Sequence, residues 1–160
     1  MSALLYFDAS ALVKAYVREE YSEEAVAFLS LAPNPITSAL SGSEVPAALC
    51  RLLRSGVLSE QAAGEALEQF WREWRSAYVL VPLDADLAAQ GGELSCRHGL
   101  RGMDGAHLAA AQWARNRLGR ESSVGFVTYD LVLWRAAGRA GFEALPPDLE
   151  ERRDRSMAAS

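Results

Sequence analysis

Residues 3–14 read ALLYFDASALVK, and this stretch decides the fold class. The apolar run at residues 3–7 is short and stops at Asp8, so we interpret it as a strand and not as a signal peptide or a membrane span. Apolar residues then recur at helical spacing from Ala11 to Tyr16. A buried strand followed directly by a helix is typical of a parallel sheet covered by helices.

The rest of the chain continues this alternation of strand and helix patterns. Further strands are expected at residues 36–37, 78–81 and 124–128, with an edge strand at 142–144. Two long helix patterns follow one another before residue 78 and form a helix–helix insertion. We expect one domain, residues 1–145, followed by a polar tail, residues 146–160, that is either mobile or an arm that binds a partner.

Pro46 leaves the start of one helix open. If Ser43 is the N-cap, Pro46 lies in the first turn and is tolerated. If the helix starts near Ser38, Pro46 should kink it. The outcome bears on the orientation of Glu44, which lies two residues before the proline.

Composition excludes several classes of protein. With 160 residues, 50% of them hydrophobic and 23% charged, the chain suits one ordinary globular domain and does not suit a disordered protein. Its net charge of 16 − 21 = −5 argues against a protein that coats nucleic acid by charge alone. A nuclease is not excluded, because an acidic metal centre itself contributes negative charge. A local basic rim is available from Lys14, Arg51, Arg54, Arg97 and Arg101.

The two cysteines indicate a reducing compartment. Cys50 and Cys96 lie within helical patterns, where we expect buried small hydrophobic side chains in a reduced cytoplasm. Neither belongs to a CxxC spacing, so we expect neither a disulfide nor a zinc site.

Four acidic residues suggest the chemistry. Asp8 and Asp130 follow predicted strands, whereas Glu44 and Asp104 lie where helical patterns begin. Strand ends and helix starts meet at one rim of a parallel sheet, where ligands bind. Two carboxylates about 4 Å apart repel one another by roughly 4 kcal/mol at an effective dielectric near 20. A divalent cation removes that repulsion, and hard oxygen ligands suit Mg²⁺ or Mn²⁺, which points to hydrolysis.

Each acid taken singly also has an ordinary structural explanation as a helix cap or a first-turn residue. Only the joint placement of the four favours a metal site, for which a capping carboxylate is already ionised and oriented. The histidines look less functional: His107 falls on the apolar stripe of its helix, as a packed core residue does, and His98 lies in a polar surface stretch. No GxSxG, GxxxxGK or GxGxxG motif occurs.

Four segments occur together in a set order. They are residues 7–14 (FDASALVK), 37–40 (TSAL) followed by Glu44, 102–109 (GMDGAHLA) and 127–130 (VTYD). Together they resemble the PIN-domain proteins of the VapC toxin type, over roughly residues 2–145. The chain departs from the family pattern at Pro46, where an aliphatic residue is usual, and at Tyr129, which is bulkier than usual.

The resemblance implies a three-layer α/β/α fold with a central, mostly parallel sheet of four to five strands, so that residues 1–145 form a PIN-like nuclease domain. It implies a cytoplasmic endoribonuclease that depends on Mg²⁺ or Mn²⁺. Such a protein is the toxin of a VapBC-type pair, is inhibited by a cognate VapB-type antitoxin and is usually a homodimer.

The resemblance also assigns residues. Asp8, Glu44, Asp104 and Asp130 match the acidic tetrad, as catalytic residues and metal ligands. A second group is assigned to substrate binding: Ser10 and Thr128 match polar positions beside the metal, and Lys14 matches a recurrent lysine.

The expected reaction is metal-assisted hydrolysis of a phosphodiester bond in single-stranded or looped RNA. The alternative is a non-catalytic PIN-like module that binds a protein, in which the acids are helix caps. A phospho-acceptor regulatory domain also gathers acids at a sheet rim, but it needs paired acids after the first strand and a lysine after a late strand. Here Asp8 stands alone, and residues 128–130 contain no lysine.

Overall fold

The computed structural model describes residues 4–118 and 123–159. The strands are β1 (Leu4–Phe7), β2 (Ile36–Ser38), β3 (Val79–Val81), β4 (Val124–Val127) and β5 (Glu143–Leu145). The helices are α1 (Ala9–Tyr16), α2 (Ser22–Leu31), α3 (Ser41–Arg54), α4 (Glu60–Ser76), α5 (Ala85–His98), α6 (Gly102–Leu118), α7 (Leu131–Arg139) and α8 (Leu149–Ala158). Ala3, which we expected in the first strand, lies outside the described residues.

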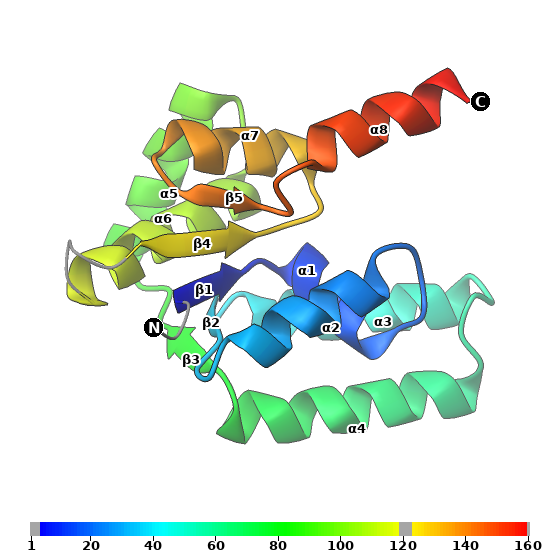
Figure 1. Ribbon diagram of the computed structural model, residues 1–160. Coiled ribbons are helices and arrows are strands. Elements are labelled where there is room, and N and C mark those ends of the chain that lie inside the picture. Colours follow the sequence, from blue (N-terminus) through cyan, green and yellow to red (C-terminus); the bar gives the residue numbers. More distant parts are fainter. Residues whose placement is uncertain (1–3, 119–122, 160) are drawn as a thin grey trace.

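The five strands form one parallel sheet with β1 at its centre (Figure 1). The strand order is β3-β2-β1-β4-β5, and every neighbouring pair is parallel. Parallel neighbours require crossover connections, which the helices supply. The predicted three-layer α/β/α fold is therefore confirmed, with five strands and a wholly parallel sheet.

Alternate residues of β1 serve two hydrophobic cores, one on each face of the sheet. Leu5 and Phe7 belong to the core shared with α1, α2, α3 and α4. Tyr6 belongs to the core shared with α5, α6 and α7. Figure 1 shows these two groups of helices on opposite sides of the sheet. The two-residue period of a strand explains why one apolar run supplies both cores.

Helices α5 and α6 approach each other closely because glycines lie at their contact. A Cβ atom built on Gly105 would lie 2.2 Å from the carbonyl oxygen of Gly91. One built on Gly91 would lie 2.8 Å from the Cα atom of Ala106. This contact fixes the first turn of α6, which carries Asp104.

Helix α3 starts at neither of the two residues that we expected. It begins at Ser41, with Leu40 as a helical N-cap that makes no side-chain hydrogen bond. Pro46 therefore lies inside the helix, beyond the first turn, and Glu44 lies in the first turn.

The polar tail contains helix α8. Leu149 is buried in the core shared with α1–α4. Arg152 pairs with Glu24 of α2 at 2.9 Å, and Arg153 donates a hydrogen bond to the carbonyl of Tyr129 at 3.2 Å. The beginning of the tail is thus packed on the domain, while Figure 1 shows the C-terminal end of α8 projecting away from it.

Cys50 and Cys96 are both free. Cys50 is half-buried and Cys96 is exposed, so the expected burial is wrong for Cys96. None of the helices within the described ranges has the length and apolar character that a membrane span needs.

Candidate active site

The candidate site lies at the carboxyl rim of the sheet, between β1 and β4. The strand order reverses at this point, because the chain runs outward from β1 to β3 and then returns to β4 beside β1. Phe7 and Val127 end the two strands in register, so the next residues, Asp8 and Thr128, emerge side by side. Open α/β sheets usually bind their ligands in the crevice at such a reversal.

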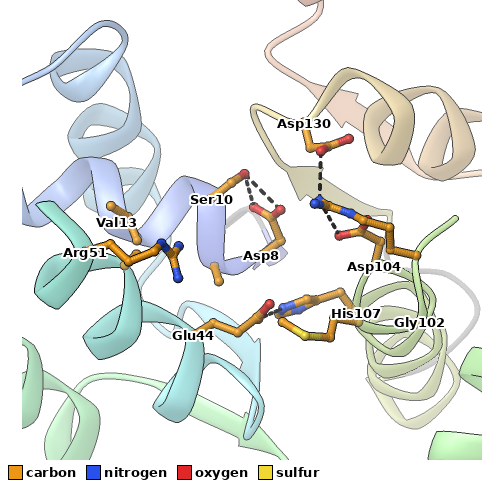
Figure 2. A pocket seen from close by; sticks show the side chains of 13 residues that line it. Asp8, Ser10, Val13, Glu44, Arg51, Gly102, Asp104, His107 and Asp130 are labelled. Atoms are coloured by element: carbon orange, nitrogen blue, oxygen red, sulfur yellow. Dashed lines mark hydrogen bonds and ion pairs between the residues drawn. The ribbon is translucent and has the colours of Figure 1, made fainter. Parts of the chain in front are cut away.

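A cavity of about 720 Å³ opens at this rim, and all four predicted acids line it (Figure 2). Asp8 and Asp130 cap the helices that follow β1 and β4. Glu44 and Asp104 lie in the first turns of α3 and α6. The structure therefore brings together four carboxylates from four separate elements, as the sequence predicts.

Asp8 is the most buried of these acids, with 4% of its surface exposed. Its Oδ1 atom accepts the backbone N–H of Ala11 at 2.9 Å, which caps α1. The hydroxyl of Ser10 donates to the carboxylate at 2.8 Å, and the hydroxyl of Thr128 donates to Oδ2 at 2.8 Å. Asp8 is thus held in one orientation by groups from the first turn of α1 and from the residue that follows β4.

The hydroxyls of Ser10 and Thr128 are themselves fixed by backbone groups. The N–H of Tyr129 donates to Ser10 Oγ at 3.1 Å, and the N–H of Asp130 donates to Thr128 Oγ1 at 3.1 Å. Each hydroxyl has one proton to donate, and that proton goes to Asp8. In this structure the two side chains orient Asp8, and we find no substrate-facing role for Thr128, which is fully buried.

Burial raises the pKa of Asp8 above its ordinary value of 3.8, because desolvation disfavours the charged form. The electrostatic influence of His107 and the hydrogen bonds from Ala11, Ser10 and Thr128 act in the opposite direction. Burial thus makes the ionised form of Asp8 less favourable than it is in water, and a bound cation would favour that form.

Lys14 is not brought to the cavity. Its Nζ atom lies 3.0 Å from Oε1 of Glu19 and donates to the carbonyl of Glu20 at 2.9 Å. It also lies 5.5 Å from the ring centre of Tyr21 and 5.2 Å from that of Tyr129. These contacts fix the chain between α1 and α2, and they give no support to substrate binding by Lys14.

Asp104 and Asp130 share the guanidinium of Arg101. The Nε atom lies 2.8 Å from Oδ2 of Asp104, and Nη2 lies 3.3 Å from Oδ2 of Asp130. The hydrogen bond to Asp104 is the main cause that raises the pKa of Arg101. The space between the two carboxylates therefore favours a positive charge.

Glu44 is held by His107 rather than by a backbone group. The Nε2 atom of His107 lies 2.5 Å from Oε2 of Glu44. His107 is buried, as expected of a core residue, but both of its ring nitrogens have polar partners, the second being the hydroxyl of Tyr6.

The donor set fits a hard divalent cation, since four carboxylates line one cavity and no thiolate is among the lining residues. Within residues 4–118 and 123–159, no group of three His, Cys, Asp or Glu side chains is arranged to hold an ion. Arg101 stands between Asp104 and Asp130 instead.

Arg101 and His107 contact the acids of the site, whereas the sequence indicated only a place in the basic rim for Arg101 and a packed core position for His107. Arg101 precedes Asp104 by three residues and His107 follows it by three. Side chains three residues apart face the same way at a helix start, so this spacing is the signal that identifies both.

Comparison with known proteins gives one family. Residues 5–138 match the family model of the PIN domain. Ribonuclease VapC45 of Mycobacterium tuberculosis is 38% identical over 108 residues, which are 68% of this chain and 74% of that protein.

Two solved structures have the same fold. Mycobacterium tuberculosis VapC20, described as a sarcin–ricin loop cleaving toxin, aligns with a TM-score of 0.60 at 19% identity, covering 89% of this chain and 99% of that chain. A toxin–antitoxin complex from Klebsiella pneumoniae contains a chain that aligns with a TM-score of 0.54 at 18% identity, covering 79% and 86%. At these identities the two structures bear on the fold alone.

Proposed function

This chain belongs to the PIN-domain family, as a protein of the VapC type, and on that premise we propose that it is a metal-dependent endoribonuclease and the toxin of a toxin–antitoxin pair. The observation that carries the proposal is the convergence of four carboxylates on one cavity at the strand-order reversal. A relative that is named a ribonuclease supports the reaction class.

We assign the ion to Asp8, Glu44, Asp104 and Asp130, directly or through water, and expect Mg²⁺ or Mn²⁺. The guanidinium of Arg101, bound to two of these acids, supports the assignment because it marks a place where positive charge is stabilised. A divalent ion at this place would exchange with the guanidinium. When bound, it would supply positive charge to the phosphate and make an attacking water more acidic.

The residues of the chain have separate tasks in the hydrolysis, in which water adds to phosphorus and one P–O ester bond breaks. Ser10 and Thr128 hold Asp8 in its orientation. Glu44 either orients the attacking water or binds a second ion. Arg101, once released from its aspartates, is free to contact a phosphate oxygen by a charge-assisted hydrogen bond.

Single-stranded or looped RNA is the expected substrate, because its backbone can enter a narrow cavity. With the ion neutralising the carboxylates, Arg51 and Arg101 on the cavity wall would supply local positive charge in a chain whose net charge is −5. They support binding of a polyanion at this point of the surface.

An antitoxin of the VapB type and a second copy of the chain are the expected protein partners. Apolar side chains on and beside the edge strand β3 support a protein contact, since Val79 is 47%, Leu80 36% and Leu83 38% exposed. Light scattering of the purified chain tests the homodimer, and a monomer at micromolar concentration would contradict it.

Asp8→Asn tests the function, with Asp84→Asn as its matched control. Both aspartates cap a helix by accepting the backbone N–H three residues on, that of Ala11 at 2.9 Å and that of Leu87 at 2.8 Å. Asp8 lines the cavity, whereas Asp84 caps α5 away from it. An asparagine caps a helix as well as an aspartate does, so both variants should fold.

We expect Asp8→Asn to lose Mn²⁺-dependent cleavage of RNA and growth arrest on expression, and Asp84→Asn to keep both. Cleavage by Asp8→Asn at the wild-type rate would refute the site. Wild-type cleavage that persists in excess EDTA would refute the metal dependence.

A further inference from the structure

A buried chain of hydrogen bonds links β1, α6 and α3 through the ring of His107. Tyr6 is 0% and His107 1% exposed. The hydroxyl of Tyr6 lies 2.8 Å from Nδ1 of His107, and Nε2 lies 2.5 Å from Oε2 of Glu44. Figure 2 shows the imidazole of His107 and the carboxylate of Glu44 meeting end to end at the edge of the cavity.

The proton on Nε2 points to Glu44 in either charge state of the histidine. The hydroxyl of Tyr6 carries one proton, which it can donate to Nδ1. In the neutral ring the remaining proton is then on Nε2, and in the imidazolium both nitrogens carry one. A neutral ring with its proton on Nδ1 would instead place a lone pair against the carboxylate, which is unfavourable at 2.5 Å.

Glu44 needs such a partner more than the aspartates do. Its side chain has one more rotatable bond than an aspartate, and it makes no cap to its own helix, whose N-cap is Leu40. Asp8 and Asp130, in contrast, are fixed by the backbone N–H groups of Ala11 and Leu133. The contact that fixes Glu44 comes from another helix, α6.

We propose that His107 is the positioning residue of Glu44: its Nε2–H holds Oε2, and this leaves Oε1 directed to the ion and the attacking water in the cavity. The hydrogen bond between Tyr6 and Nδ1 fixes the orientation of the His107 ring. The inference rests on the proposed function, because it assigns Glu44 a task in metal binding. Carboxylate ligands of metals are commonly held by outer hydrogen bonds of this kind.

The competing explanation is that His107 only ties α3 to α6 and stabilises the fold. The two explanations differ in what His107 does to metal binding when no RNA is present. Calorimetric titration of the RNA-free protein with Mn²⁺ measures this, and thermal unfolding in EDTA measures the structural contribution separately.

Two substitutions distinguish the effect of the N–H donor of His107 from the effect of its side-chain volume. His107→Leu keeps apolar volume and removes the N–H group, whereas His107→Gln keeps an N–H donor on a side chain of similar reach. We expect His107→Leu to weaken Mn²⁺ binding by about 10–100-fold, the range for outer-sphere partners of metal ligands. His107→Gln should restore most of that loss.

A double-mutant cycle with Glu44→Ala shows whether His107 acts through Glu44. In the Glu44→Ala background, His107→Leu should weaken Mn²⁺ binding no further. An equal loss with and without Glu44, or an unchanged Mn²⁺ affinity in His107→Leu, would overturn the inference. If His107→Leu does not fold, the same cycle is measured with Tyr6→Phe in its place. Tyr6→Phe should weaken Mn²⁺ binding by a smaller factor, and this loss should also disappear in the Glu44→Ala background.

Asp8→Asn distinguishes failure of this inference from failure of the proposed function. If Asp8→Asn binds Mn²⁺ as the wild type does, the metal site itself is wrong and the positioning role falls with it. If Asp8→Asn loses Mn²⁺ binding while His107→Leu retains it, the function stands and the role of His107 is overturned.

Discussion

Replacing Gly105 by alanine tests whether the close contact of α5 with α6 sets the position of the site. The added Cβ atom would lie 2.2 Å from the carbonyl oxygen of Gly91 and 2.1 Å from Oγ of Ser95, whereas ordinary contact begins at 3.4 Å. The hydroxyl of Ser95 can rotate away, but the carbonyl belongs to the backbone. The two helices must therefore separate by about 3.4 − 2.2 = 1.2 Å.

Such overpacking costs about 1–3 kcal/mol, and a backbone contact places Gly105→Ala at the upper end of that range. Alanine is better than glycine in a helix interior by about 1 kcal/mol, so the net loss should be about 2 kcal/mol. For a chain of this size that lowers the unfolding temperature by roughly 4–8 °C.

Gly92→Ala is the matched control on the facing helix, because a Cβ atom at Gly92 meets no atom of the described residues within 4 Å. It should raise the unfolding temperature by roughly 2–4 °C, for a gain of about 1 kcal/mol. Circular dichroism in EDTA measures both variants. Since α6 carries Asp104, Gly105→Ala should also weaken Mn²⁺ binding. If the unfolding temperature of Gly105→Ala were as high as that of Gly92→Ala, the packing argument would be refuted.

Three further predictions concern charge, pH and the tail. Arg101→Gln should tighten Mn²⁺ binding by up to about fivefold. The guanidinium then no longer competes with the ion for the two aspartates, and an exposed ion pair contributes about 0.2–1 kcal/mol. Unchanged or weaker binding in a calorimetric titration would contradict this. Because the pKa of Asp8 in the folded protein is above its ordinary value, the folded state favours the protonated carboxyl. This contribution to the free energy of unfolding is fully present below pH 3.8 and is lost as the pH rises through the raised pKa. Asp8→Asn should therefore be more stable than the wild type in EDTA near pH 7, with an advantage that shrinks on acidification; equal unfolding temperatures throughout would show that burial does not penalise this carboxylate. Leu149→Ala should lower the free energy of unfolding by about 2–5 kcal/mol, because Leu149 is 0% exposed, whereas Met157→Ala, at 75% exposed, should leave it nearly unchanged; equal urea denaturation midpoints would mean that α8 is not packed on the domain.

The sheet and the rim were predictable because local patterns specify them. The run at residues 3–7 and the run at 124–128 are short, apolar and bounded by polar residues, which identifies buried parallel strands. Once the first strand is central, the carboxyl ends of neighbouring strands must meet. The convergence of Asp8 and Asp130 follows from this geometry without any knowledge of side-chain contacts.

The contacts made by individual side chains were not predictable, since they depend on residues far apart in the chain. His107 bonds to Tyr6 across 101 positions and to Glu44 across 63 positions, so its helix alone shows only an apolar stripe. Helix α8 packs on the domain through Leu149, its buried residue, and through the contacts of Arg152 and Arg153 with distant residues, in a largely polar stretch. Lys14 likewise contacts Glu19 and the aromatic rings that lie nearest to it, and it does not line the cavity.

Anomalous diffraction from crystals soaked in Mn²⁺ tests most directly whether the four carboxylates form a metal site. We predict an anomalous peak inside the cavity, in contact with Asp8 and at least one of Asp104 and Asp130, with the guanidinium of Arg101 moved off both aspartates. Crystals that bind Mn²⁺ only at other places, with Arg101 still between the two aspartates, would contradict the proposed active site.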